Sequence, residues 1–586
     1  MNKTSGKPYW LFILLLMIWE IFLTFQGLDL ADTGFQLTAF RFIFDAPYSV
    51  QYSMMFWFSD VCGALWMKLF PAGGLYWFKI GWVVFINLGL IFYSRLLRET
   101  LSKRETIIGL ALTTVFILRG GPECLNYDIF STFGYAAGIA TIYLGLTRNR
   151  SGLLLLSGFV FGMSVFFKLS NLSALAFLIL IPYFSLLQKE TFRRFLKKSA
   201  LWLSGFLIGM ALILITIALV GHYQLFIDNL RFLSKMGADS QASHGLMPMI
   251  TSYLSGYVNA IVMLVIAGVI LLLYVHLSKK FKSFQSNNIQ LFLLFLILGL
   301  TIVLSIYFRE AFWSKIRYLF IGLMIIAGVQ GLTNIILSHE KRLLYLAGLL
   351  LLLIVPLGSD SGLAKSVWGM WILGPLVISN FFKPEYLDKF GLNISLRQSI
   401  FIKRYFITIL LVSAVFYAWQ HTYFDVGSRI QKTATIDHPK LKFIYTSEKR
   451  AHVMNELIRE GFPKIKEQQY LLSFIEIPML NYLTDKKPFL STSWPKLYYS
   501  PATFKQKLYE ALQKRKSYPA IIRQKQNTTI NDWPSSTDPN YLSYPDSLSK
   551  WPEHGKILNE FMATNNYEVV WENEMFQVLI TNRIRD

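Results

Sequence analysis

The chain has 586 residues, of which 54% are hydrophobic and only 16% charged, and it contains 48 Phe and 30 Tyr. This composition is too apolar for a soluble protein of this size, so we expect a polytopic membrane protein. The net charge of +22 does not indicate nucleic-acid binding, because basic residues also gather at the cytoplasmic ends of membrane helices. The sequence has no glycine-rich phosphate loop and no HExxH or CxxC spacing, so soluble nucleotide-driven chemistry finds no support.

About thirteen apolar runs of membrane length precede residue 421. A bilayer core about 30 Å thick needs roughly 20 apolar residues of helix, and charged segments separate runs of this order. Because several runs are short, eleven or twelve crossings also fit the pattern. The runs are 8–27, 74–94, 105–119, 128–147, 152–168, 170–187, 200–221, 252–276, 288–308, 318–337, 343–357, 367–382 and 402–420.

Lys and Arg predict the orientation of these helices. With the N-terminus inside, the cytoplasmic loops receive roughly twice as many basic residues as the outer loops, which fits the positive-inside rule. The first run is too long for a signal-peptide core and lacks a small-residue cleavage site, so we expect it to be retained. With an odd number of crossings, the chain after residue 420 lies outside.

The first outer loop, residues 28–73, combines acidic and aromatic residues. Its part from 35 to 70 is neither a clean membrane span nor polar enough to be solvated, which favours helices lying on the outer interface. The loop also carries Asp29 and Asp32 in "GLDLADTGF". A carboxylate near bilayer depth is costly unless it faces a polar cavity, so both are candidates for function.

Further acidic residues occur in "GGPECLNYDIF", where Glu123 and Asp128 precede or begin the fourth run. The same argument makes them site candidates. Cys62 and Cys124, the only cysteines, also fall in predicted outer loops. They could form a disulfide in an oxidising compartment or remain two thiols.

From residue 421 to 586 the sequence changes to short apolar runs alternating with helical pieces. "QYLLSFIEI" and "YPAIIRQ" have strand character, and "SPATFKQKLYEALQKRK" has helical character. The end of the chain predicts a helix, a strand, a turn at Glu572–Asn573–Glu574 and a final strand. We therefore expect a small extracytoplasmic α/β domain over 421–586, after a transmembrane domain over 1–420.

Four short motifs resemble segments of a known family, in the same order along the chain. They are "LADTGFQL" with Asp32, "NYD" at Asn126–Asp128, "FGMSVFFKLSNL" with Lys168, and "SKIRYLF" with Arg317 and Tyr318. Together they are similar to the GT-C superfamily of membrane glycosyltransferases, in particular its aminoarabinose transferase and dolichyl-phosphate-mannose-dependent branches. The last motif lacks the proline of the family's RYLLP-type segment. The tail has no tryptophan-rich WWD signature, which speaks against the oligosaccharyltransferase branch.

The resemblance implies a GT-C-like fold over 1–420 that moves a sugar from a polyprenyl-phosphate donor to an acceptor. The transfer would occur on the outer face of the cytoplasmic (inner) membrane of a bacterium and would invert the anomeric configuration. Asp32 would be the general base, with Asp128 as a second catalytic residue. The residues implied for substrate binding, including cations for the leaving phosphate, are Asp29, Glu123, Lys168, Arg309, Lys315, Arg317 and Tyr318.

The partners implied are the lipid-linked donor, membrane lipids and a glycan, lipid or protein acceptor, with no nucleic acid. No cofactor is certain, and a divalent metal ion that bridges carboxylate and phosphate oxygens stays open. The residues also allow plainer roles, because Asp32 and Asp128 could cap helices and Lys315 and Arg317 could anchor a span by snorkelling.

Two other functions fit the same pattern of membrane spans. The chain could be a transporter or flippase of lipid-linked sugars without chemistry, or a lipid-carrier-dependent polymerase or ligase of surface polysaccharide. Against a transporter, the ionisable groups crowd one face of the membrane instead of its midplane.

Overall fold

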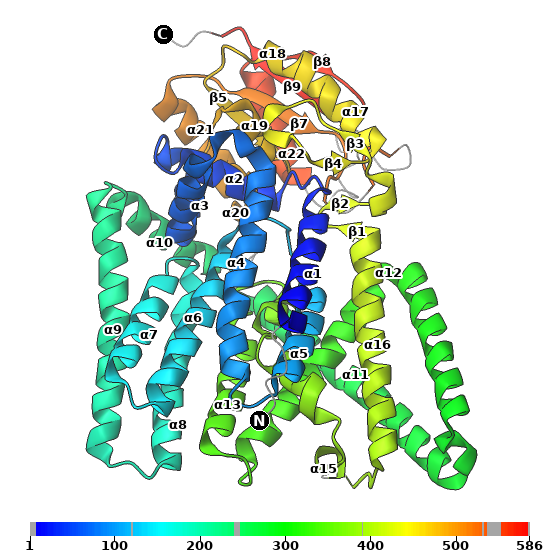
Figure 1. Cartoon of the computed structure of the whole chain (residues 1–586). Helices are drawn as coiled ribbons and strands as arrows, with labels where there is room; N and C mark the ends of the chain where they lie inside the picture. Colours follow the sequence, from blue (N-terminus) through cyan, green and yellow to red (C-terminus); the bar gives the residue numbers. More distant parts are fainter. Residues whose placement is uncertain are drawn as a thin grey trace.

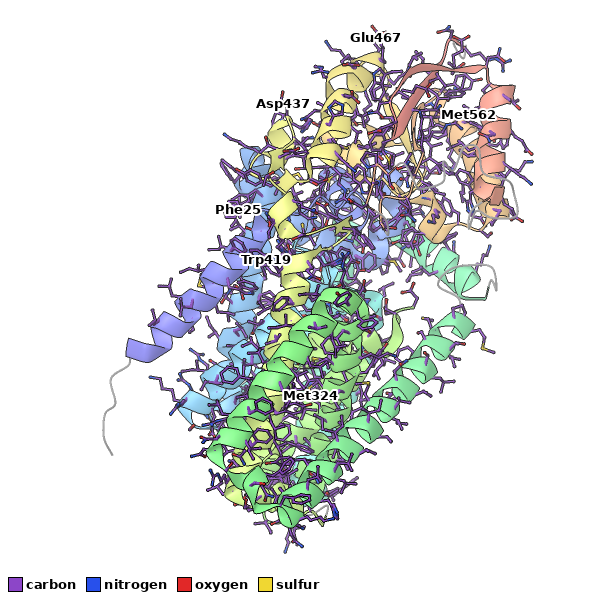
Figure 2. The ribbon with its side chains drawn as sticks, turned by 90° about the vertical axis from the view of Figure 1, so that its right-hand side faces the viewer. Phe25, Met324, Trp419, Asp437, Glu467 and Met562 are labelled. Atoms are coloured by element: carbon purple, nitrogen blue, oxygen red, sulfur yellow. The ribbon has the colours of Figure 1, made fainter. Side chains whose placement is uncertain are left out.

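A computed structural model describes residues 7–118, 121–238, 246–388, 391–529, 532–535 and 552–583. A bundle of long helices lies below a smaller domain of strands and short helices (Figure 1). In the view turned by 90°, Met324 lies in the bundle, Phe25 and Trp419 lie at its upper boundary, and Glu467 and Met562 lie in the smaller domain (Figure 2). The predicted class, a polytopic helical protein with a small C-terminal α/β domain, is confirmed.

Seven helices of the described chain are long and apolar enough to cross a membrane, or eight if the bent pair Gly362–Gly369 and Leu373–Phe381 forms one span. The chain is thus a multi-pass membrane protein, and about thirteen crossings stay a prediction. The helices of the bundle are α1 (Lys7–Thr24), α4 (Gly74–Leu97), α5 (Lys103–Ile117), α6 (Tyr127–Thr147), α7 (Ser151–Ser164), α8 (Leu180–Leu187), α9 (Phe192–Leu219), α10 (Tyr223–Ala238), α11 (Leu246–Lys280), α12 (Asn287–Thr333), α13 (His339–Ile354), α14 (Leu373–Leu376), α15 (Pro384–Leu387) and α16 (Leu396–Gln420).

Helix α12 is broken in its middle. Its 47 residues would extend about 70 Å as one straight helix, more than twice the hydrocarbon thickness. At Arg309 the backbone has φ 42° and ψ −117°, which is outside the helical region and divides α12 into two limbs. The limbs correspond to the two apolar runs predicted at 288–308 and 318–337.

Glycines bring α7 and α9 into backbone contact. A Cβ at Gly158 or Gly162 would lie about 2 Å from a carbonyl oxygen of α9, and one at Gly205 or Gly209 would meet α7 in the same way. Small residues allow this close approach between membrane helices. The contact fixes the end of α7, from which the chain continues to Lys168.

The smaller domain contains a five-stranded mixed sheet in the order β6-β5-β7-β9-β8. Strand β5 runs parallel to β6 and β7, whereas β9 is antiparallel to β7 and β8. Every residue of β5 is buried, as expected for a covered parallel strand. The elements of the domain are β5 (Tyr470–Phe474), β6 (Lys487–Pro488), β7 (Ala520–Gln524), β8 (Tyr567–Glu572), β9 (Phe576–Thr581), α17 (Glu448–Glu456), α18 (Phe462–Lys464), α19 (Met479–Thr484), α20 (Pro495–Tyr498), α21 (Pro501–Arg515) and α22 (Pro552–Thr564).

Two short hairpins connect the bundle to this sheet. They are formed by β1 (His421–Thr422) with β2 (Asp425–Val426), and by β3 (Ala434–Thr435) with β4 (Tyr445–Thr446). Backbone hydrogen bonds join the second hairpin to the first loop: Tyr445 N donates to Phe25 O at 2.7 Å, and Gly27 N donates to Tyr445 O at 3.0 Å. The end of α1 is therefore attached to the smaller domain.

The predicted first outer loop forms α2 (Asp32–Phe42), a 3-10 segment (Pro47–Phe56) and α3 (Trp57–Leu69). Helix α2 is buried along most of its length, beneath α19. A Cβ at Gly34 would lie 2.3 Å from the backbone nitrogen of Met479, so glycine permits this contact. By contrast, α3 exposes Leu65 and Leu69, which are suited to contact with lipid.

Candidate active site

Two aspartates at the start of α2 have different partners. The Asp29 carboxylate is buried and accepts hydrogen bonds from Ala31 N at 2.8 Å and Thr33 N at 2.7 Å, so it stabilises the turn into the helix. Asp32 is the first helical residue, and the N-cap position belongs to Ala31. The carboxylate of Asp32 is therefore not used for capping.

Asp32 accepts a hydrogen bond from the hairpin that connects the bundle to the smaller domain. The Tyr423 hydroxyl, between β1 and β2, donates to Asp32 Oδ2 at 2.5 Å. Burial raises the pKa of Asp32, while the hydrogen bond from Tyr423 and the positive charge of Lys365 oppose this rise. Burial, followed by the charge of Asp32, also raises the pKa of Asp29 to about 7. A carboxylate whose pKa is raised in this way is suited to accept a proton.

Asp128 lies in the first turn of α6, between two lysines. Its carboxylate pairs with Lys365 Nζ at 3.0 Å and with Lys168 Nζ at 3.6 Å, and all three side chains are largely buried. The capping role at this helix belongs to Asn126, whose Oδ1 accepts from Asp128 N and Ile129 N. Asp128 is therefore free to bind cations through its side chain.

These groups form one electrostatic cluster. After burial and the Tyr423 hydrogen bond, the charges of Lys365, Asp128 and Asp360 also shift the pKa of Asp32, and Asp128 in turn pairs with Lys365 and Lys168. The side chains of the cluster come from α2, α6, the segment after α7 and the segment after α13. Of the predicted residues, Asp29, Asp32, Asp128 and Lys168 are brought together here.

The predicted cations of α12 have other contacts. The Arg317 guanidinium lies 4.9 Å from the ring centroid of Trp313 and 5.2 Å from that of Tyr318, and it donates to Ser314 Oγ at 3.0 Å. Lys315 Nζ donates to Asn259 Oδ1 at 2.6 Å, and Arg309 is exposed at the break of the helix. In the described part of the chain, no ion pair joins these α12 residues to Asp32 or Asp128.

Glu123 is held at the junction of the two parts of the molecule. Its carboxylate pairs with Arg429 at 2.6 Å, and both side chains are buried. Arg429 also donates to Ala418 O at 2.6 Å and to Leu23 O at 3.2 Å, so it links α16 with α1. Nearby, Glu123, Asp29 and Tyr423 line a small pocket with room for about one water molecule.

Sequence reasoning missed Lys365 and Tyr423. Lys365 could have been found as one of the few basic residues on the predicted outer side, where the positive-inside rule makes Lys and Arg scarce. Tyr423 carried no signal, because its partner Asp32 is 391 residues away. Asp60 on α3 is a further buried acid: neither carboxylate oxygen has a hydrogen-bond partner among the described residues, and burial raises its pKa well above the ordinary value.

The donor set does not fit a divalent cation. Both oxygens of Asp29 accept backbone hydrogen bonds, and Asp128 is neutralised by two lysines. No group of three or more His, Cys, Asp or Glu in the described ranges could hold a metal ion. Such an ion prefers several free oxygen ligands. Cys62 and Cys124 are free thiols.

No protein-family model and no curated protein matches the chain. Its structure is similar to that of ArnT from Cupriavidus metallidurans bound to undecaprenyl phosphate, with a TM-score of 0.46 and 9% identity over 98% of each chain. The apo form of ArnT from the same organism gives a TM-score of 0.39 and 12% identity, again over 98% of each chain. The Archaeoglobus fulgidus oligosaccharyltransferase in complex with Zn and sulfate gives a TM-score of 0.46 and 10% identity, over 87% of this chain and 68% of that chain. At these values the likeness bears on no individual residue of this chain.

Proposed function

We propose that the chain is a glycosyltransferase that moves a sugar from a polyprenyl-phosphate donor to an acceptor. The reaction takes place at the outer face of the bacterial cytoplasmic membrane, with the N-terminus inside and residues 421–586 outside. The observation that supports this proposal best is the buried Lys168–Asp128–Lys365 cluster, whose Lys365 charge opposes the rise that burial causes in the pKa of Asp32, the acceptor of the Tyr423 hydrogen bond. A base and two cations next to each other are what transfer from a glycosyl phosphate requires.

Asp32 is the base in this mechanism. Its carboxylate takes the proton of an acceptor hydroxyl while the hydroxyl oxygen attacks the anomeric carbon. The bond from that carbon to the phosphate oxygen breaks, and the electron pair leaves with the phosphate. Attack from the face opposite the phosphate inverts the configuration. General base catalysis of this kind contributes roughly 10²- to 10⁴-fold.

Lys168 and Lys365 supply positive charge for the leaving phosphate. Both ammonium groups now contact Asp128, and an arriving phosphate would share them, because each ammonium has three N–H donors. Asp128 keeps the two lysines together in this arrangement. Its proposed catalytic role is therefore to orient cations, with Asp29 supporting the turn that presents Asp32.

Arg309, Lys315, Arg317 and Tyr318 stay candidates for donor binding along α12. The support comes from Arg317, whose Nε is buried without a hydrogen-bond partner in the described structure. A buried guanidinium donor without an acceptor is costly, and a phosphate oxygen would satisfy it. Glu123 is less suited to contact substrate, since Arg429 occupies its carboxylate.

The test compares wild type with Asp32→Asn in lipid nanodiscs, using a panel of radiolabelled polyprenyl-phosphate sugars. We expect the variant to release and transfer sugar at least about 100-fold more slowly. Asp45→Asn is the matched control, because Asp45 lies in the same loop but is exposed and paired with Arg41. Equal turnover by Asp32→Asn and wild type would refute the assignment. Movement of intact donor across the bilayer without sugar release would favour a transporter.

A further inference from the structure

A second pocket lies between the first outer loop, α10 of the bundle and the smaller domain. It has a volume of about 240 Å³, and six of its lining residues carry the argument below: Tyr48, Tyr52, Asp228, Asn229, Ser491 and Lys507. These residues come from the segment Pro47–Phe56, from α10 and from the sheet domain including α21. Figure 1 shows α10 beneath the smaller domain on the side of α2 and α3.

The lining offers hydrogen-bond donors and acceptors beside aromatic rings. The Asp228 carboxylate accepts hydrogen bonds from the Gln224 amide at 3.0 Å and the Arg231 guanidinium at 3.3 Å. Lys507 pairs with Glu510 at 2.7 Å, so charges of both signs border the pocket. Tyr52 presents its ring edge-on to Phe232 at a centroid distance of 5.5 Å.

This combination matches a saccharide better than an apolar or a highly charged ligand. Each sugar hydroxyl both donates and accepts, so it can use carboxylate, amide, hydroxyl and ammonium partners together. The C–H face of a sugar ring packs against aromatic side chains such as tyrosine, which have an apolar face and a polar tip. The volume is just below the roughly 300–1,000 Å³ of small-molecule sites, which corresponds to about one sugar ring.

Aromatic rings connect the pocket to the helix that carries the proposed base. Tyr52 stacks on Tyr498 with a centroid distance of 3.5 Å. On the other side, Tyr498 packs against Phe35 of α2 at 5.5 Å, one helical turn from Asp32. A pair of stacked tyrosine rings thus separates the pocket from the helix that carries the base.

We propose that this pocket binds a saccharide unit of the acceptor that is remote from the reacting hydroxyl. The inference rests on the proposed function, because it names the acceptor as a glycan or glycolipid. Both the smaller domain and the first loop contribute to the pocket. The smaller domain supplies α21 and Ser491, and the first loop supplies Tyr48 and Tyr52. An acceptor held by both would present its next unit toward α2.

Binding is tested by saturation-transfer NMR on the full chain in nanodiscs, with glucose, galactose and N-acetylglucosamine as probes. Wild type should transfer saturation to the ring protons of at least one probe. The double variant Asp228→Ala/Lys507→Ala removes two hydrogen-bonding groups and should weaken binding by about ten-fold or more. Lys505→Ala is the matched control, because Lys505 lies on the same helix but pairs with Glu560.

Kinetics distinguishes this site from the active site. In the transfer reaction the double variant should raise KM for the acceptor by about ten-fold and leave KM for the lipid donor unchanged. Asp32→Asn should lose transfer while retaining saccharide binding. Absence of saccharide binding in wild type, or unchanged binding in the double variant, would overturn the site alone. Saccharide binding that depends on Asp228 and Lys507, without any sugar transfer by wild type, would refute the proposed function and leave the saccharide site standing.

Discussion

Replacing Tyr423 by Phe removes one hydroxyl and tests how Asp32 is tuned. The Tyr423 hydroxyl donates to Asp32 Oδ2 at 2.5 Å, and burial raises the pKa of Tyr423 well above its ordinary value, so this group stays a donor. A hydrogen bond to a charged group contributes about 1.5–3 kcal/mol. Since about 1.4 kcal/mol corresponds to one pKa unit, the substitution should raise the pKa of Asp32 by about 1 to 2.

The sign of the effect follows from the proposed role of Asp32 as the base. Asp32 accepts a proton only when it is ionised, so a higher pKa shifts the acidic limb of the pH–rate profile to higher pH. On that limb, kcat/KM for sugar transfer should fall by about 10- to 100-fold and should recover above the new pKa. The assay is donor-to-acceptor transfer measured from pH 4 to 9, with Tyr509→Phe on the exposed face of α21 as control. A profile for Tyr423→Phe that superposes on that of wild type would refute the reasoning.

Three further substitutions test the surroundings of the site. Lys365→Met leaves Asp128 with the more distant Lys168 and should cost about 3 kcal/mol or more of stability. The thermal midpoint should therefore drop more than for Lys168→Met. Equal drops would contradict the inference that the shorter ion pair stabilises Asp128 more. Glu123→Gln breaks the buried pair with Arg429 and should destabilise the fold by about 3–5 kcal/mol in the same thermal assay. An unchanged midpoint would contradict a structural role and leave substrate binding as the role of Glu123. Gly34→Ala places a Cβ 2.3 Å from Met479 N and should abolish the yield of folded protein in size-exclusion chromatography. The control Gly152→Ala has open space around it and should stabilise the folded protein by up to about 1 kcal/mol. A normal yield of Gly34→Ala would show that α2 can move away from α19.

Local patterns predicted the elements of the chain well. Apolar runs of about 20 residues coincide with helices because a bilayer selects for that length. The end of the chain also follows its prediction, with α22, then β8, a turn around Asn573, and β9. In both cases the signal lies within a few neighbouring residues.

The continuation of α12 past its break and the assembly of the site could not be predicted in this way. The charged stretch from Arg309 to Arg317 separates two predicted apolar runs, but it does not show that the helix resumes directly after the single non-helical residue Arg309. Asp32, Asp128 and Lys168 could be proposed from motifs, but Lys365 reaches Asp128 across 237 residues. Such pairing depends on the packing of distant helices, which no local pattern encodes.

The main-chain bonds between Phe25, Gly27 and Tyr445 have a consequence for recombination. If related proteins exchanged residues 421–586 alone, the incoming segment would meet a first loop whose backbone and glycine contacts fit a different domain. A functional chimera should therefore exchange residues 25–73 together with 421–586. Under the proposed function, acceptor preference would then be transferred together with two segments that lie far apart along the chain.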